Sequence, residues 1–405
     1  MKVRSLGSYE EDAPKYFYRA RHLRLEHHGS TFETPLRVLN NTDFNAKGNA
    51  PSTAVLRSPV SGIFKNLNRK EVEQLLTLNT ASERLITSLD TFTQKMQYSD
   101  FIFASIQPPA SAITTTLSSD SVKDKFLRMV FKVQKEAGLE SLTVPWLRLS
   151  TEQTLEMYRR VDRESDAEPI FMLDASADPR QLKTLSEYLT GLIDTERIHM
   201  IGVRYRPVRK ALASYDTMWE ALRDKDVAVV LSEVPRYEQD SANLSGAHMN
   251  QFVLGDILAT KVSRSHTDGK DGGAGGSIGV GAARLSIRPE KPSTVEELKE
   301  VLRFFDRRDL IVRPVLNQSE AEWSSRVLSE LNEPQLKLAL ENYKEAVNDP
   351  SKLKALNAFS RVHETVTSQK EFELSRRFVG KGEAAEYLEG KETLSRSLRS
   401  TRRTK

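Results

Sequence analysis

Short apolar runs alternate with amphipathic segments through the middle of the chain. The runs predict strands at 101–106, 142–147, 170–173, 199–203, 227–231, 252–258 and 310–312. Most of the segments between them carry apolar residues at helical spacing, as in Asp120 to Ala137. Each strand–helix unit spans about thirty residues, and right-handed crossovers make successive strands parallel. The pattern predicts an α/β fold, and periodicity alone leaves open whether its sheet is open or closed.

The segments on either side of this repeat have other patterns. Residues 16–39 predict a β-hairpin that turns at Gly29-Ser30. Residues 40–65 show little periodicity and predict a long loop, whereas Arg69 to Met96 has the spacing of one helix.

Helical patterns dominate the C-terminal part. Thr294 to Phe305 predicts a helix with acidic residues in its first turn, before the last strand at 310–312. From Ser319 onward only helical signals remain. We therefore expect a main domain over residues 1–318 and a helical appendage over 319–405.

The stretch Glu168 to Pro179 combines a buried strand with two carboxylates. Four apolar residues lead into Asp174, and the carboxyl ends of parallel strands are where α/β proteins place ligands. Asp178 and Pro179 are typical of a helix N-cap and first turn. Asp174 is thus either a cap of this βα loop or an active-site carboxylate.

The composition restricts the chemistry. The 405 residues are 38% hydrophobic and 29% charged, and none is cysteine. The absence of cysteine excludes disulfides, thiolate nucleophiles and cysteine-ligated zinc. No apolar run approaches the length of a membrane span, and Met1 to Asp12 lacks the apolar core of a signal peptide. We expect a cytoplasmic protein.

Positive charge gathers near the C-terminus. The net charge of the chain is only +4, but six cations stand between residues 391 and 405: Lys391, Arg396, Arg399, Arg402, Arg403 and Lys405. Such segments bind polyanions through phosphate contacts, so we expect this one to contact nucleic acid. The alternative is a solvated terminus.

Two further features predict no site. His27 and His28 are adjacent, but no carboxylate or third histidine follows at ligand spacing, so surface loop residues are expected and no metal. Residues 269–281 hold seven glycines but lack the strand, helix and Lys-Ser/Thr of a phosphate-binding loop. A flexible loop or lid is expected there.

Several segments resemble a known family. Arg19 to Leu25, the Gly29 turn and Glu33-Thr34-Pro35 resemble the opening of the tRNA-guanine transglycosylases. Phe171 to Asp174 and Phe252 to Thr260 are similar to later strands of that family, and Val234 to Tyr237 resembles the Pro-Arg-Tyr segment before its late catalytic strand. The resemblance implies a (β/α)₈ TIM-type barrel behind the N-terminal hairpin.

The same resemblance implies roles for single residues. Asp256 would be the nucleophile that attacks C1′, and Asp174 would hold the guanine-type base. The candidate neighbours of these two aspartates are Asp178, Gly202, His248 and Arg264. The implied reaction swaps guanine for a 7-deazaguanine in tRNA or DNA without cofactor or metal. Both aspartates must then lie within about 10 Å of each other to reach one nucleoside.

Three family segments have no counterpart here. They are the Asp-Ser-Gly-Gly-Phe segment with a further essential aspartate, the Gly-Gly-Leu base-binding segment, and the zinc site. The alternative is a barrel that has lost catalysis and acts as a nucleic-acid-binding subunit, with a protein partner or as a homo-oligomer. A third interpretation is an unrelated barrel enzyme that acts on a small phosphorylated substrate.

Overall fold

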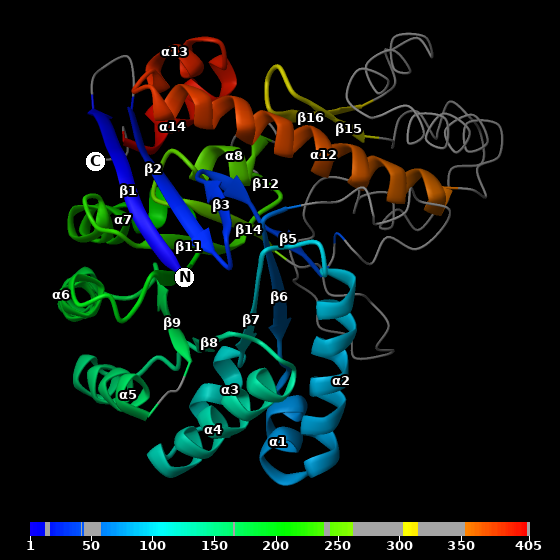
Figure 1. The fold of residues 1–405 in the computed structure, drawn as a ribbon, viewed down its shortest axis with the longest axis vertical. Helices are drawn as coiled ribbons and strands as arrows, with labels where there is room; N and C mark the ends of the chain where they lie inside the picture. The colour runs from blue at the N-terminus through cyan, green and yellow to red at the C-terminus, as the bar shows by residue number, and fades with distance from the viewer. Residues whose placement is uncertain are drawn as a thin grey trace.

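Nine parallel strands form the centre of the computed structural model, which describes residues 1–12, 17–41, 43, 58–164, 167–238, 244–261, 303–314 and 353–402. These strands are β4 (Leu36–Arg37), β5 (Leu39–Asn40), β6 (Val60–Asn66), β7 (Phe101–Gln107), β8 (Ser141–Val144), β9 (Glu168–Asp174), β10 (Met200–Arg204), β11 (Ala228–Val234) and β14 (Ile257–Thr260). Six pair in the order β4-β14-β11-β10-β9-β8, and three in the order β5-β6-β7. The fold is therefore mixed α/β around parallel sheets (Figure 1).

The two parallel sheets meet at both of their edges. Only Val38 separates β4 from β5, and its N–H donates to the carbonyl of Leu258 at 2.9 Å. At the other edge β7 lies beside β8, and just beyond β8 the N–H of Trp146 donates to Oε1 of Gln107 at 3.2 Å. The edge strands of the two sheets therefore lie next to each other at β4–β5 and at β7–β8.

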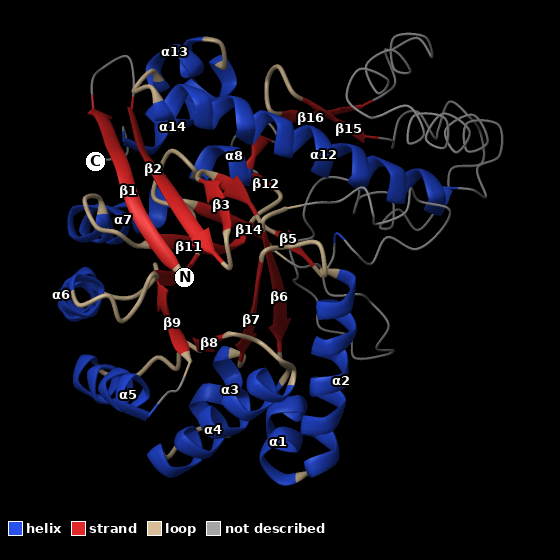
Figure 2. Cartoon of the chain, viewed as in Figure 1, coloured by secondary structure: helices blue, strands red, loops and turns tan. Residues whose placement is uncertain are grey.

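The helices follow the strands along the chain and lie on their outer side (Figure 2). They are α1 (Arg69–Thr77), α2 (Asn79–Lys95), α3 (Ala110–Thr115), α4 (Asp120–Glu136), α5 (Thr151–Glu164), α6 (Pro179–Asp194), α7 (Val208–Leu222) and α8 (Gly246–Asn250). In α6 the predicted cap is confirmed, because the Asp178 side chain accepts from the N–H of Arg180 and Pro179 opens the first turn. The leucines of its inner face are buried, and this burial fixes the helix against the sheet.

An antiparallel sheet covers the amino ends of the parallel strands. It consists of β1 (Lys2–Asp12), β2 (Phe17–His27) and β3 (Ser30–Glu33). Its contacts reach residues that immediately precede parallel strands: the N–H of Ser5 donates to Asp226, and the hydroxyl of Ser30 to Asp100, both at 2.6 Å. The predicted hairpin is thus present as β2 and β3, while β1 adds a strand that the pattern did not predict.

The C-terminal part is helical where the structure describes it. It contains α12 (Leu353–Gly380), α13 (Ala384–Glu389) and α14 (Glu392–Arg402). Arg376 in α12 donates to the carbonyl of Glu33 at 2.7 Å, and Arg402 in α14 pairs with Asp12 at 2.7 Å. These helices therefore pack on the N-terminal sheet. No helix of the described ranges is long and apolar enough to cross a membrane.

A small antiparallel sheet lies beside α12. It has the order β12-β13-β16-β15 and consists of β12 (Tyr237–Glu238), β13 (Leu244–Ser245), β15 (Arg303–Asp306) and β16 (Ile311–Pro314). The strand predicted at 310–312 is thus a strand, but it belongs to this sheet and not to the parallel repeat. The helix predicted over 294–305 is wrong at its end, where β15 begins at Arg303.

Three other predicted boundaries are corrected. The predicted loop 40–65 contains β6, whose Gly62 packs so tightly that an added Cβ would lie 2.6 Å from the Phe64 ring. The predicted helix 69–96 is two helices, broken at the extended residue Leu78. The predicted strand 252–258 begins only at Ile257, because residues 251–254 form a turn in which several N–H groups donate back to the carbonyl of Asn250. The glycine-rich stretch 269–281 lies outside the described residues.

Candidate functional site

A pocket opens at the carboxyl ends of the parallel strands, the position at which α/β proteins bind ligands. Its lining comes from the ends of six parallel strands and from the segments after them. The lining residues are Phe64, Asn66, Ser105, Gln107, Trp146, Met172, Arg204, Ser232, Glu233, Thr260 and Lys261.

One side of the pocket combines apolar surfaces with an amide. Phe64, Trp146 and Met172 supply the apolar surfaces. Gln107 is 8% exposed; its Nε2 donates to the hydroxyl of Ser105 at 3.2 Å, while its Oε1 accepts from the N–H of Trp146. These hydrogen bonds fix the amide of Gln107 at the pocket wall.

Another part of the lining carries a charged pair. Arg204 at the end of β10 donates from Nε to Glu233 at 2.7 Å. Glu233 has a φ of +59°, a left-handed conformation that is uncommon for residues other than glycine. Such conformations collect at functional sites. Glu233 is the only carboxylate among the residues that line this pocket.

Asp174 lies behind this charged pair. It is fully buried and accepts hydrogen bonds from the N–H and hydroxyl of Ser176, at 2.8 and 2.6 Å, and from two nitrogens of Arg206 at 3.0 Å. Burial alone would raise the pKa of Asp174, but the bonds from Arg206 and Ser176 outweigh it and hold the pKa below its usual range. Asp174 therefore stays ionised and orders the βα loop beside the pocket.

Asp256 lies at the other end of the sheet. It precedes β14, is 2% exposed, accepts from the N–H of Val229 at 2.7 Å and pairs with Arg21 at 3.4 Å. Burial raises its pKa to about 6, although Arg21 and Val229 act in the opposite direction. It faces the N-terminal sheet rather than the pocket.

The register separates the two aspartates. Asp174 lies beside Arg204 of β10, and Arg204 lies beside Ser232 of β11. Asp256 lies beside Val229 of β11 instead, because its N–H donates to the carbonyl of Val229. Three residues of strand correspond to about 10 Å, and three strand spacings add further distance across the sheet. The structure does not bring Asp174 and Asp256 together, and one nucleoside cannot contact both.

The remaining predicted substrate-binding residues are dispersed. Asp178 caps α6, and Gly202 in β10 faces the pocket residue Met172, whose Sδ would lie 2.0 Å from an added Cβ. His248 is buried in α8 with its ring stacked between Phe305 and Phe372, and burial lowers its pKa to about 3. Arg264 lies outside the described residues.

The predicted nucleic-acid-binding cations fall into two groups. Lys391 is buried against Glu371 at 2.9 Å, and Arg402 pairs with Asp12 and Asp216. Arg396 is exposed beside Glu392, and Arg399 is half-buried on the same helix. Arg403 lies outside the described residues. Of these described cations, Arg396 is exposed, and Arg399 lies on the same helix without a paired carboxylate from the N-terminal sheet.

No protein-family model matches this chain. No curated protein matches it in sequence. The function is therefore inferred from the residues and their geometry.

Sequence reasoning missed the residues that line the pocket most closely. Gln107, Arg204 and Glu233 each end or closely follow a predicted strand, and that position is a usable signal in α/β folds. The pattern did not select them because each is a common residue type without a motif around it.

Proposed function

We propose that the two parallel sheets together form a closed (β/α)₈ barrel, with β4 and β5 sharing one strand position. The strand order then follows the chain order. One apolar cluster supports the closure, because it joins Val60 and Phe101 of one sheet with Ile170, Met200 and Val230 of the other. The bond from Trp146 to Gln107 supports the junction between β7 and β8.

Within this barrel, the pocket binds a nucleobase presented by nucleic acid after its lining side chains move apart, because the closed cavity of about 10 Å³ has room for only about one water molecule. The observation that carries the proposal is the pairing of apolar surfaces with fixed polar groups: Trp146 and Met172 offer apolar contact, and Gln107 and Arg204 offer hydrogen bonds. A base removed from its stack is bound in this way, by stacking and by hydrogen bonds to its edge. The resemblance to tRNA-guanine transglycosylases points to the same ligand class.

The proposal excludes Asp256 as the nucleophile. At the carboxyl end of β14, where a reacting group would face the pocket, the chain has Thr260 instead of a carboxylate. The function supported best is therefore base recognition by a transglycosylase-like barrel that does not use Asp256 chemically.

Calorimetric titration with guanine and with a 7-deazaguanine tests this proposal. We expect the wild-type protein to bind one of them and Gln107→Ala to bind at least about tenfold more weakly, because a buried hydrogen-bonding edge is left unmatched. Gln94→Ala, on the exposed side of α2, is the matched control. Equal affinity of the wild-type protein and Gln107→Ala, with unchanged thermal unfolding, would contradict the proposal.

Base exchange is the second candidate, and the strained position of Glu233 favours it. Glu233 would then be the nucleophile in place of Asp256. Incorporation of labelled guanine into tRNA or DNA by the wild-type protein, abolished in Glu233→Gln and retained in Asp256→Asn, would favour exchange over recognition alone.

Nucleic acid is the proposed partner, and α14 supplies the test. We expect Arg396→Gln with Arg399→Gln to weaken binding to tRNA or duplex DNA and to lower the slope of log affinity against log salt by about 1 to 2, because each phosphate contact releases counterions. Fluorescence anisotropy across a salt series measures this slope. Lys132→Gln, a solvent-exposed cation of α4, is the control. An unchanged slope in the double variant would remove α14 from the interface.

A further inference from the structure

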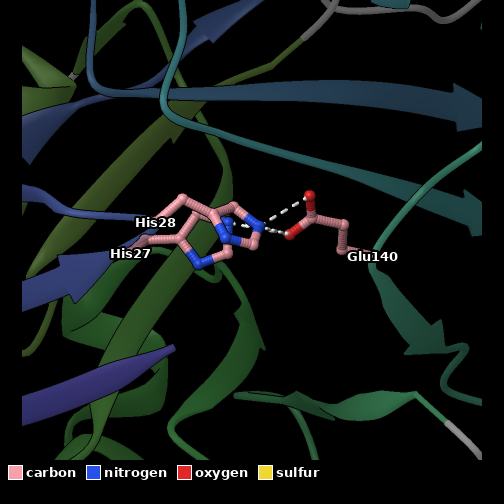
Figure 3. A group of neighbouring side chains, drawn as sticks. All are labelled: His27, His28 and Glu140. Atoms are coloured by element: carbon pink, nitrogen blue, oxygen red, sulfur yellow. Dashed lines mark hydrogen bonds and ion pairs between the residues drawn. The ribbon is translucent and has the colours of Figure 1, made fainter.

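Two adjacent histidine rings converge at the β2–β3 turn. Successive residues of a strand normally point to opposite faces, but His28 has a φ of +47° and Gly29 a φ of +83°. This turn brings the His28 ring back toward His27, with the ring centroids 4.1 Å apart (Figure 3). Both Nε2 atoms then face the same point.

A carboxylate from a distant part of the chain occupies that point. Glu140, directly before β8, places Oε2 2.8 Å from Nε2 of His27 and Oε1 3.0 Å from Nε2 of His28. The donor atoms of the three residues all lie within 4.8 Å of one another. Figure 3 shows the carboxylate directed at both rings.

The burial of His27 distinguishes this group from an ordinary surface ion pair. His27 is 8% exposed, with the Phe101 ring edge-on at 5.2 Å. Its Nε2 is buried and has no aligned hydrogen-bond partner, despite the short distance to Glu140. A buried nitrogen that faces a carboxylate without an aligned hydrogen bond is a position that a bound ion would satisfy, and here a second histidine nitrogen faces the same carboxylate.

We propose that His27, His28 and Glu140 bind a divalent transition metal of the zinc type. Imidazole nitrogens and a carboxylate oxygen are ligands of such ions at about 2.0–2.2 Å, and tetrahedral bonds of that length place ligand atoms about 3.3 Å apart. The distances between the Nε2 atoms and the carboxylate oxygens need only a slight widening. His28 and Glu140 are exposed at 71% and 54% of their side-chain surface, which leaves a fourth position for water.

The consequence of this site is structural. The histidines belong to the N-terminal sheet, and Glu140 belongs to the segment that enters β8. A bound ion would join the antiparallel sheet to the parallel one, and its affinity for the folded state would add to the stability of the protein.

Zinc titration of the full chain, first treated with a chelator and then dialysed, tests the site. We expect one Zn²⁺ per chain by calorimetry and a rise in the unfolding temperature with Zn²⁺. In His28→Ala and Glu140→Gln we expect affinity at least about tenfold lower and no rise in unfolding temperature. Both residues are exposed, so these variants should fold normally.

His199→Ala is the matched control. It removes a histidine that also faces a carboxylate, Glu168 at 3.2 Å, but without a second histidine. We expect it to bind Zn²⁺ as the wild-type protein does. Absence of stoichiometric binding by the wild-type protein, or equal Zn²⁺ affinity in His28→Ala, Glu140→Gln and the wild-type protein, would overturn the proposal.

Discussion

Replacing Arg21 by Met is expected to lower the free energy of unfolding by about 3–5 kcal/mol, because it leaves a buried carboxylate without its counter-charge. Arg21 is 3% exposed, pairs with Asp256 at 3.4 Å and donates to the carbonyl of Leu222 at 2.7 Å and to that of Val227. Methionine fills similar space but carries no positive charge to neutralise the carboxylate of Asp256. Denaturant unfolding at pH 7 measures the loss.

The control for this prediction is Arg24→Met on the same strand. Arg24 pairs with Glu33 at 3.1 Å, but 45% of its side chain is exposed, so its loss should cost less than about 1 kcal/mol. A cost for Arg21→Met as small as the cost of Arg24→Met would show that the buried pair contributes nothing.

The pH dependence of the Arg21→Met variant has a definite sign. The folded-state pKa of Asp256, about 6, lies above its ordinary value of 3.8, so folded protein binds the proton more tightly than unfolded protein does. The contribution of Asp256 to stability therefore falls as the pH rises through this window. Arg21→Met raises that pKa further. The difference in free energy of unfolding between the wild-type protein and Arg21→Met should therefore be smaller at pH 5 than at pH 8. A difference that is equal at both pH values would mean that the carbonyl contacts alone cause it.

Replacing Glu371 by Ala is expected to detach α13 and α14, with a cost of about 3–5 kcal/mol. Glu371 is fully buried; it pairs with Lys391 at 2.9 Å and Arg307 at 2.6 Å and accepts from the hydroxyl of Tyr387. Burial would raise the pKa of Glu371, but Lys391 and Arg307 hold it below its usual value. Without this carboxylate, the buried ammonium of Lys391 loses its counter-charge and keeps only the carbonyl of Arg307, and the hydroxyl of Tyr387 loses its acceptor.

Hydrogen exchange resolves where the loss occurs. We expect faster exchange across residues 384–402 in Glu371→Ala and unchanged exchange in α6. Glu373→Ala, an exposed position two residues further along α12, is the control and should behave as the wild-type protein does. Protection of α13 and α14 that survives Glu371→Ala would show that apolar packing alone holds them.

Much of the fold was readable from local pattern. The strand that ends at Asp174 and the helix capped by Asp178 are both present, because a continuous apolar run and a cap–proline pair are local signals. Strand β6 was missed because Ser61 and Gly62 have the composition of a loop. Gly62 is required by close packing against Phe64 and Phe103, and only the three-dimensional arrangement reveals that requirement.

The candidate site was less predictable than the fold. The apolar run from Phe252 to Leu254 resembles a strand, but its N–H groups donate back to the carbonyls of Met249 and Asn250 in a turn. The carbonyl of Phe252 accepts from a strand, through the N–H of Arg19. That error of a few residues placed Asp256 at the wrong end of a strand. His27 and His28 lacked a third ligand in the sequence because Glu140 lies 112 residues from His28. Neither the position of Asp256 relative to β14 nor the approach of Glu140 to the two histidines can be recognised from residues close together in the sequence.

The packing of α12 and α14 on β2 has a consequence for biosynthesis. The guanidinium of Arg402 lies 4.8 Å from the centroid of the Phe17 ring, and Arg376 reaches the carbonyl of Glu33 across 343 positions of the chain. At 5–20 residues per second, a ribosome needs about 17–70 s to make that intervening length. During this interval the outer side of β2 stays uncovered on the nascent chain. Chaperones that bind exposed strands therefore have an opportunity of tens of seconds to bind β2.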